Sequence, residues 1–132
     1  MEKKLKHLDF LQLVITRMNV NSFLVKGWSV TLVAAMFAFA AKDSNSKYVF
    51  ITIVTTLIFW LLDAYYLSQE RQYRDLYNII RLKEERDIDF DMNASLYNKG
   101  RSTWPSSFFA FTLCIFYVTI LSLTVIVTLI II

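Results

Sequence analysis

The sequence predicts an all-α integral membrane protein: three transmembrane helices, an N-terminal amphipathic helix, and a long second helix that projects into the cytoplasm. Of its 132 residues 56% are hydrophobic, and they gather in three blocks instead of being spread through the chain as in a soluble core. There are only two glycines and one proline to interrupt helices. This composition excludes a disordered chain and a disulfide scaffold, and it argues strongly against a soluble enzyme.

The three apolar blocks differ in how closely they fit a membrane span. Residues 23–41 form the first block, and their charge-free part, 27–41, covers only about 22 Å as a helix. Lys26 must therefore extend its ammonium group toward the lipid headgroups. Residues 48–68 have the length that a span needs. Residues 106–132 contain no charge, which is typical of a membrane helix.

The distribution of positive charge predicts the orientation in the membrane. The chain has 14 lysines and arginines, and only Lys42 and Lys47 lie between the first and second blocks. By the positive-inside rule the N-terminus is cytoplasmic, these two lysines lie in an outer turn, and the C-terminus faces outward. Trp28, Trp60 and Trp104 lie toward the inner ends of their blocks, as expected for an aromatic belt.

Two cytoplasmic stretches remain, one before the first block and one between the second and the third. Over residues 2–19, apolar side chains recur at spacings of three and four, which predicts an amphipathic helix. This helix either lies on the inner leaflet or packs against neighbouring subunits or the second stretch. The second block meets no glycine or proline at its inner end, so we expect one helix over residues 47–86, about 60 Å long. A loop over residues 87–105 then returns to the membrane.

The projecting helix carries a stripe of tyrosines and charged residues that needs a partner. Together with residues 5–18, residues 66–86 would form a cytoplasmic collar, which either receives a signal or holds a partner protein. The candidate partner-contact residues are Tyr66, Glu70, Tyr73, Arg74, Tyr77 and Arg81.

Asp63 is the charged residue closest to membrane depth in the second block. A carboxylate there is costly and usually faces a partner or water. One interpretation is a tether from Asp63 to Lys26 or Arg71; the other is a charged ring at the mouth of an oligomeric pore. Small and hydroxyl-bearing residues in the first and third blocks fit close helix packing or a narrow polar path. The candidate oligomer or pore residues are Lys26, Ala34, Ala38, Asp63, Thr112, Thr119 and Ser122.

No set of residues in the sequence indicates catalysis, a cofactor or a metal. His7 is the only histidine and is expected in an exposed basic region, while Cys114, the only cysteine, lies in the third block without a ligand cluster. The alternating series DIDFDMN over residues 87–93 has the spacing of a calcium loop but lacks its glycine, so we expect a solvated acidic loop. Balanced charge over residues 69–105 argues against nucleic-acid binding.

Three segments carry a resemblance: NSFLVKGWSVTLVAA, FWLLDAYYLSQERQYRDLYN, and FDMN before the final apolar helix. They resemble a group of small, uncharacterised three-span bacterial inner-membrane proteins, similar in build to the membrane effectors of anti-phage defence operons. The resemblance covers nearly the whole chain. It implies a non-enzymatic, homo-oligomeric protein of the inner membrane, channel-like or membrane-disrupting, that is gated through its cytoplasmic helices. The alternative is a non-conducting scaffold or accessory subunit that anchors a cytoplasmic protein partner in the lipid bilayer.

Overall fold

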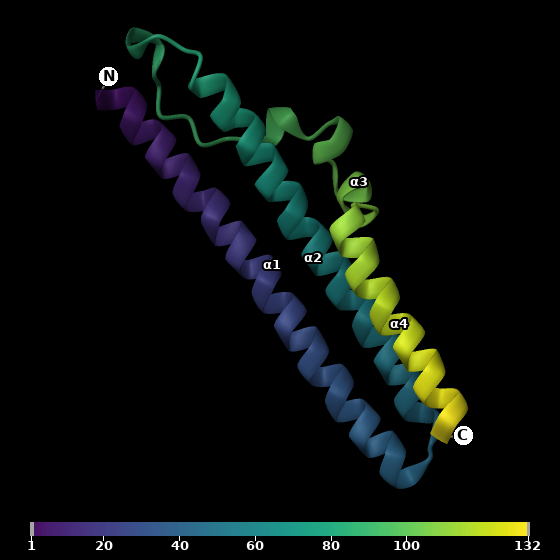
Figure 1. Ribbon diagram of the computed structural model, residues 1–132. Coiled ribbons are helices and arrows are strands. Elements are labelled where there is room, and N and C mark those ends of the chain that lie inside the picture. Colours follow the sequence, from purple (N-terminus) through teal and green to yellow (C-terminus); the bar gives the residue numbers. More distant parts are fainter. Residues whose placement is uncertain (1, 132) are drawn as a thin grey trace.

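Two long antiparallel helices, α1 (Glu2–Asp43) and α2 (Ser46–Ile80), form the frame of the protein (Figure 1). The computed structural model describes residues 2–131 and has no strand among them. A third long helix, α4 (Phe111–Ile131), runs antiparallel to the N-terminal half of α2. The fold is therefore all-helical, as predicted.

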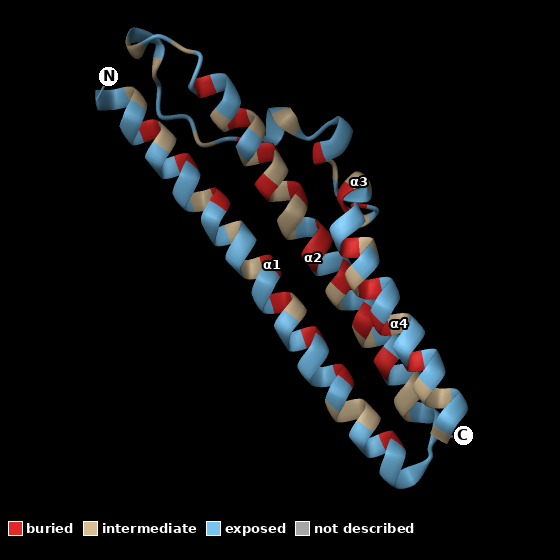
Figure 2. Ribbon diagram, in the orientation of Figure 1, coloured by how far each residue is buried: buried red, intermediate tan, exposed pale blue. Residues whose placement is uncertain are grey.

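Each of the three long helices is long and apolar enough to cross a membrane. Their buried residues face the neighbouring helices, and their outward faces are exposed (Figure 2). Those outward faces carry large apolar side chains such as Phe50 and Phe111, which are 69% and 77% exposed. An apolar outer surface of this extent suits a multi-pass membrane protein, because the hydrocarbon core of a bilayer can cover it.

The predicted N-terminal amphipathic helix and the predicted first span are parts of one continuous helix. Residues 2–19 and 23–41 both lie in α1, and no glycine or proline separates them. The N-terminal half of α1 packs against α2, since Leu11 belongs to one apolar cluster with Leu76 and Ile80. Residues 2–19 therefore contact the stretch that follows the second apolar block.

The second helix ends at Ile80, six residues before the predicted end at residue 86. Ile80 is 1% exposed, and the chain turns back toward α1 directly after it. Glu85 then accepts hydrogen bonds from the backbone N–H groups of Lys3, at 2.7 Å, and Lys4, at 3.1 Å. A straight continuation of α2 would carry Glu85 away from these groups, so the end of α2 at Ile80 accompanies a tertiary contact that the local sequence does not indicate.

The third apolar block is broken near its start, which corrects the single helix predicted over residues 106–132. A short helix, α3 (Trp104–Phe108), is followed by two non-helical residues before α4 begins. The indole N–H of Trp60 on α2 donates to the carbonyl oxygen of Phe108 at 2.9 Å, and the two rings stack at 4.2 Å. The side chain of Trp60 thus satisfies a carbonyl group that the end of α3 leaves without a helical partner.

Three hydrogen bonds from backbone N–H groups to side chains order the loop between α2 and α3. The side chains of Asp89, Asp91 and Asn93 each accept the backbone N–H two residues further on, at 3.1, 2.9 and 3.0 Å. These are Asx turns, and they account for the alternate spacing of the series. Within residues 2–131, no group of three or more His, Cys, Asp or Glu side chains could hold a metal ion. The loop also contains three short 3₁₀ turns, η1 (Glu85–Asp87), η2 (Ser95–Tyr97) and η3 (Gly100–Ser102).

Candidate functional site

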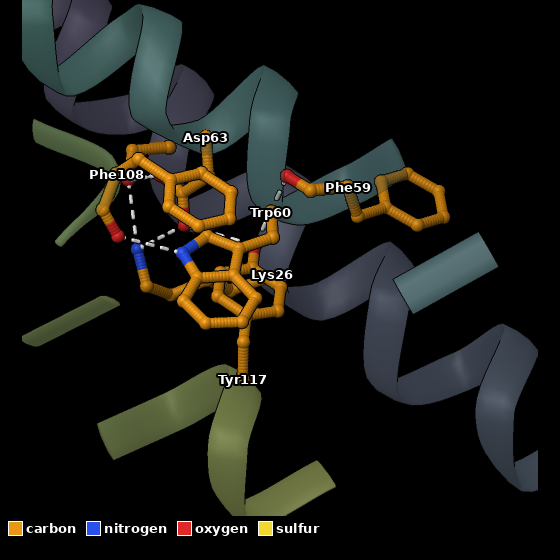
Figure 3. A network of polar contacts seen from close by, with 7 residues as sticks. Lys26, Phe59, Trp60, Asp63, Phe108 and Tyr117 are labelled. Atoms are coloured by element: carbon orange, nitrogen blue, oxygen red, sulfur yellow. Dashed lines mark hydrogen bonds and ion pairs between the residues drawn. The ribbon is translucent and has the colours of Figure 1, made fainter. Parts of the chain in front are cut away.

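Four polar side chains from the three long helices meet inside the bundle (Figure 3). We call Ser22, Lys26, Asp63 and Tyr117 the polar cluster. The Asp63 side chain has no exposed surface, and the Lys26 ammonium lies 2.6 Å from its Oδ2. The Tyr117 hydroxyl donates to the same oxygen at 2.9 Å, and the Ser22 hydroxyl donates to Oδ1. One carboxylate therefore links α1, α2 and α4.

The surroundings of the polar cluster are apolar and aromatic. Ser22 and Lys26 are four residues apart on one face of α1, and the ammonium also donates to the Ser22 hydroxyl at 2.9 Å. Trp60 lies one turn from Asp63 and stacks on both Phe108 and Tyr117, with ring centroids 4.2 and 5.7 Å apart. An ion pair in such surroundings is screened little, so each partner depends strongly on the other.

The structure forms one of the two predicted tethers and not the other. Lys26 pairs with Asp63, whereas the Arg71 guanidinium donates to the backbone carbonyl of Arg101 at 2.6 Å. Sequence reasoning missed Ser22 and Tyr117 as partners of Asp63. Two weak signals were present: Ser22 precedes Lys26 by one helical turn, and Tyr117 is the only tyrosine in the third apolar block.

The other candidate oligomer or pore residues are not part of the polar cluster. All five are exposed, with Ala34 and Ala38 on α1 and Thr112, Thr119 and Ser122 on α4. The Thr119 hydroxyl donates to the carbonyl oxygen of Ile115, in its own helix, at 2.6 Å. Because these side chains are exposed, their outer surfaces are open to a second copy or another partner.

The candidate partner-contact residues divide between the inside and the outside of the chain. Tyr73 and Tyr77 pack on the apolar cluster that includes Leu11, so α1 already covers part of the tyrosine stripe. Glu70 is buried and accepts from the Arg74 guanidinium at 2.9 Å. Tyr66 is half-buried, while Arg74 and Arg81 are exposed.

His7 is buried, not exposed as the basic sequence around it suggested. Its side chain has 0% exposure because the loop after α2 folds over this part of α1. Its Nε2 lies 2.9 Å from the carbonyl oxygen of Asp91, and its ring lies 5.6 Å from that of Phe90. Phe90 adopts a left-handed backbone conformation, with φ of 55°, at this fold-back. Cys114 is half-buried, with its sulfur 3.9 Å from the carbonyl oxygen of Phe108.

Comparison of the chain with protein-family models, with curated proteins and with solved structures found no match. The geometry of the polar cluster and of the surfaces around it is therefore the basis on which a function can be proposed.

Proposed function

We propose that this protein is a non-enzymatic, self-associating protein of the bacterial inner membrane that acts as a channel-like or membrane-disrupting effector. The observation that carries the proposal is the buried carboxylate of Asp63, which holds three candidate spans together. Ionisable residues inside membrane segments cost free energy to bury, and they commonly mark sites where a membrane protein moves or conducts. In this proposal the polar cluster is a latch that keeps the closed packing of the helices.

The continuity of the helices supports control from the collar, which this proposal places in the cytoplasm together with the N-terminus. Both α1 and α2 run unbroken from the collar to the polar cluster. The apolar cluster of Leu11, Leu76 and Ile80 joins the same two helices in the collar. A signal that separates them there would be transmitted to Lys26 and Asp63, and it would shift the population from the closed packing to an open one.

Self-association is part of the proposal because the spaces between the spans of one chain are small. The cavity lined by residues such as Ala40, Thr52 and Thr124 holds about 10 Å³, which is at most the room of one water molecule, and an open hollow of about 160 Å³ lies between α1 and α4. On the outside, the exposed Ala34 and Ala38 are four residues apart on α1. Small residues at this spacing allow helices to approach closely in a membrane.

The test is leakage from vesicles that contain the purified full-length chain and a trapped ion-sensitive dye. Asp63→Asn removes the charge that holds the latch, so we expect faster leakage than with the wild type. Asp87→Asn is the control, since Asp87 is exposed in the loop, outside the polar cluster. Tyr117→Phe is a milder second variant that removes one hydrogen bond to Asp63. If both latch variants insert and remain helical but leave the vesicles as tight as protein-free vesicles, the effector function is rejected.

A non-conducting scaffold that anchors a cytoplasmic protein is the second candidate function. It is favoured by Leu82 and Leu96, which are 77% and 74% exposed in the loop region beyond the candidate spans. A lipid tail would not reach apolar side chains there, but a protein partner would cover them. For a scaffold, vesicles stay tight with every variant, and Leu82→Ser with Leu96→Ser releases the protein that co-purifies from the native host.

A further inference from the structure

A basic cavity of about 560 Å³ lies between α2 and the η3 turn. It is separate from the polar cluster and plays no part in the proposed latch. Its charged lining comprises Glu70, Arg71, Arg74, Asp75, Lys99 and Arg101. Four cationic side chains thus face two carboxylates, which leaves the cavity with an excess of positive charge.

Both carboxylates of the cavity are already engaged by neighbouring side chains. Glu70 accepts from the Arg74 guanidinium at 2.9 Å, and Asp75 accepts from the Ser102 hydroxyl at 2.6 Å. The side chains of Lys99 and Arg101, by contrast, make no hydrogen bond or ion pair with any residue of 2–131. Their donors remain available for an anion from outside the chain.

Hydrogen bonds to its backbone hold the loop that carries Lys99 and Arg101 against α2. The Arg71 guanidinium donates to the backbone carbonyl of Arg101 at 2.6 Å, which ties α2 to the loop. The buried amide of Gln72 donates to the backbone carbonyl of Ser102 at 3.1 Å, and the Ser68 hydroxyl donates to the same oxygen at 2.7 Å. These bonds hold the loop against the helix, so the backbone positions that carry the cations are already close together before any ligand arrives.

The chain leaves the basic cavity at Ser102, and two residues later Trp104 lines an apolar groove of about 360 Å³. It is lined by Leu61, Trp104, Pro105, Phe108 and Phe109. The indole N–H of Trp104 donates to the carbonyl oxygen of Leu61 at 3.0 Å, and its ring meets that of Tyr65 edge to face. Tryptophan and tyrosine are typical of the boundary between headgroups and hydrocarbon.

We infer that the basic cavity binds the phosphate group of an anionic phospholipid, with an acyl chain lying in the neighbouring groove beside Trp104. Arginine and lysine donors match phosphate oxygens in charge and geometry, and basic pockets between membrane helices bind lipid headgroups. A soluble phosphate compound has the same headgroup chemistry but would leave the apolar groove empty. The inference requires neither conduction nor self-association.

The experiment measures lipid binding to the full-length chain in a neutral detergent by native mass spectrometry. Phosphatidylglycerol is the anionic probe, phosphatidylcholine is the neutral lipid, and glycerol phosphate is the soluble headgroup. We expect phosphatidylglycerol to bind more tightly than phosphatidylcholine. We also expect the double variant Lys99→Gln, Arg101→Gln to weaken the binding of phosphatidylglycerol about tenfold or more. Because these two side chains make no internal bonds, the variant should keep the wild-type helix content and thermal midpoint.

The matched control is the double variant Lys6→Gln, Arg17→Gln, which removes the same charge from exposed positions of α1. Arg17 lies at the same level of the bundle as the cavity, because Leu11 packs near Leu76 and Ser22 bonds to Asp63. If both double variants lose the same affinity for phosphatidylglycerol, the lipid site in the basic cavity is overturned, and the binding reflects general attraction between opposite charges. Equal binding of the two lipids would also overturn it. Glycerol phosphate is tested as a competitor of phosphatidylglycerol. If it binds as tightly as phosphatidylglycerol does, the cavity is a phosphate site, but its assignment to a phospholipid is overturned.

Discussion

The ammonium group of Lys26 lies 2.6 Å from the carboxylate of Asp63, which has no exposed surface. The two residues are 37 positions apart in sequence, on antiparallel helices. A buried ion pair of this kind adds little net stability compared with an apolar pair, because both charges lose their hydration. Removal of Lys26 alone is strongly destabilising, since the Asp63 carboxylate is then left buried without an opposite charge.

We therefore expect Lys26→Met to lower the free energy of unfolding by about 3 kcal/mol or more. The double variant Lys26→Met, Asp63→Asn should be more stable than Lys26→Met alone, because no charge is then left buried. Equilibrium unfolding in mixed detergent micelles measures both values, with Lys42→Met as the control at an exposed position. Additive effects of the two substitutions would show that the pair is not coupled.

The hydroxyl of Tyr117 is expected to stabilise the same carboxylate. It donates to Asp63 at 2.9 Å from a side chain that is 0% exposed, so Tyr117→Phe should cost about 2 kcal/mol. The same unfolding assay applies. Tyr65→Phe is the matched control, because Tyr65 is 42% exposed and its hydroxyl makes no hydrogen bond within residues 2–131. If Tyr117→Phe is as stable as Tyr65→Phe, the hydroxyl of Tyr117 does not stabilise the carboxylate of Asp63.

Glu85 is expected to hold the first turn of α1 in place. Its carboxylate accepts from the backbone N–H groups of Lys3 and Lys4, as a capping side chain does. Glu85→Ala should therefore speed hydrogen exchange in that turn, because the turn opens more often without its cap. Glu84→Ala removes an exposed carboxylate that pairs with Arg86 instead, and it should leave the exchange unchanged. Equal exchange in the two variants would contradict the capping role.

The Asx turn at Asp89 should depend on pH. The backbone N–H of Asp91 lowers the pKa of Asp89, and the positive charge of Lys83 lowers it further. The folded value therefore lies below the unfolded value of about 3.9. The stabilisation is fully present above about pH 4 and is lost as the pH falls through the folded pKa. The measurement is the NMR shift of the Asp91 amide between neutral and acid pH.

Asp89→Asn separates this titration from the turn itself. The asparagine side chain still accepts the Asp91 N–H, so the turn persists, and the acid step in the amide shift should shrink to the part that the carboxylate of Asp91 itself contributes. Asp87→Asn is the control and should keep the full step. A step of unchanged size in Asp89→Asn would assign it to a group other than Asp89.

Several features could be predicted because local sequence is enough to specify them. Long apolar blocks with almost no glycine or proline specify helices that suit a membrane, since every backbone group is then bonded within its own segment. The pairing of Lys26 with Asp63 could also be anticipated, because a charge at that depth requires a partner and Lys26 lies at a similar depth. For residues 87–93 the sequence predicted only a solvated acidic loop, and the structure adds the Asx turns, in which short polar side chains reach backbone groups two positions away.

Contacts between residues distant in sequence decided the rest. The break after Phe108 depends on the indole of Trp60, and the end of α2 at Ile80 accompanies the contact of Glu85 with the start of α1. The burial of His7 depends in the same way on the loop that folds over it. Hydrophobic periodicity reports which face of a segment is apolar, but it does not report which segment covers that face. The sequence by itself therefore determined the helices and their apolar faces. Only the tertiary structure decided where those helices stop and which polar groups they enclose, because both depend on partners that come together through folding.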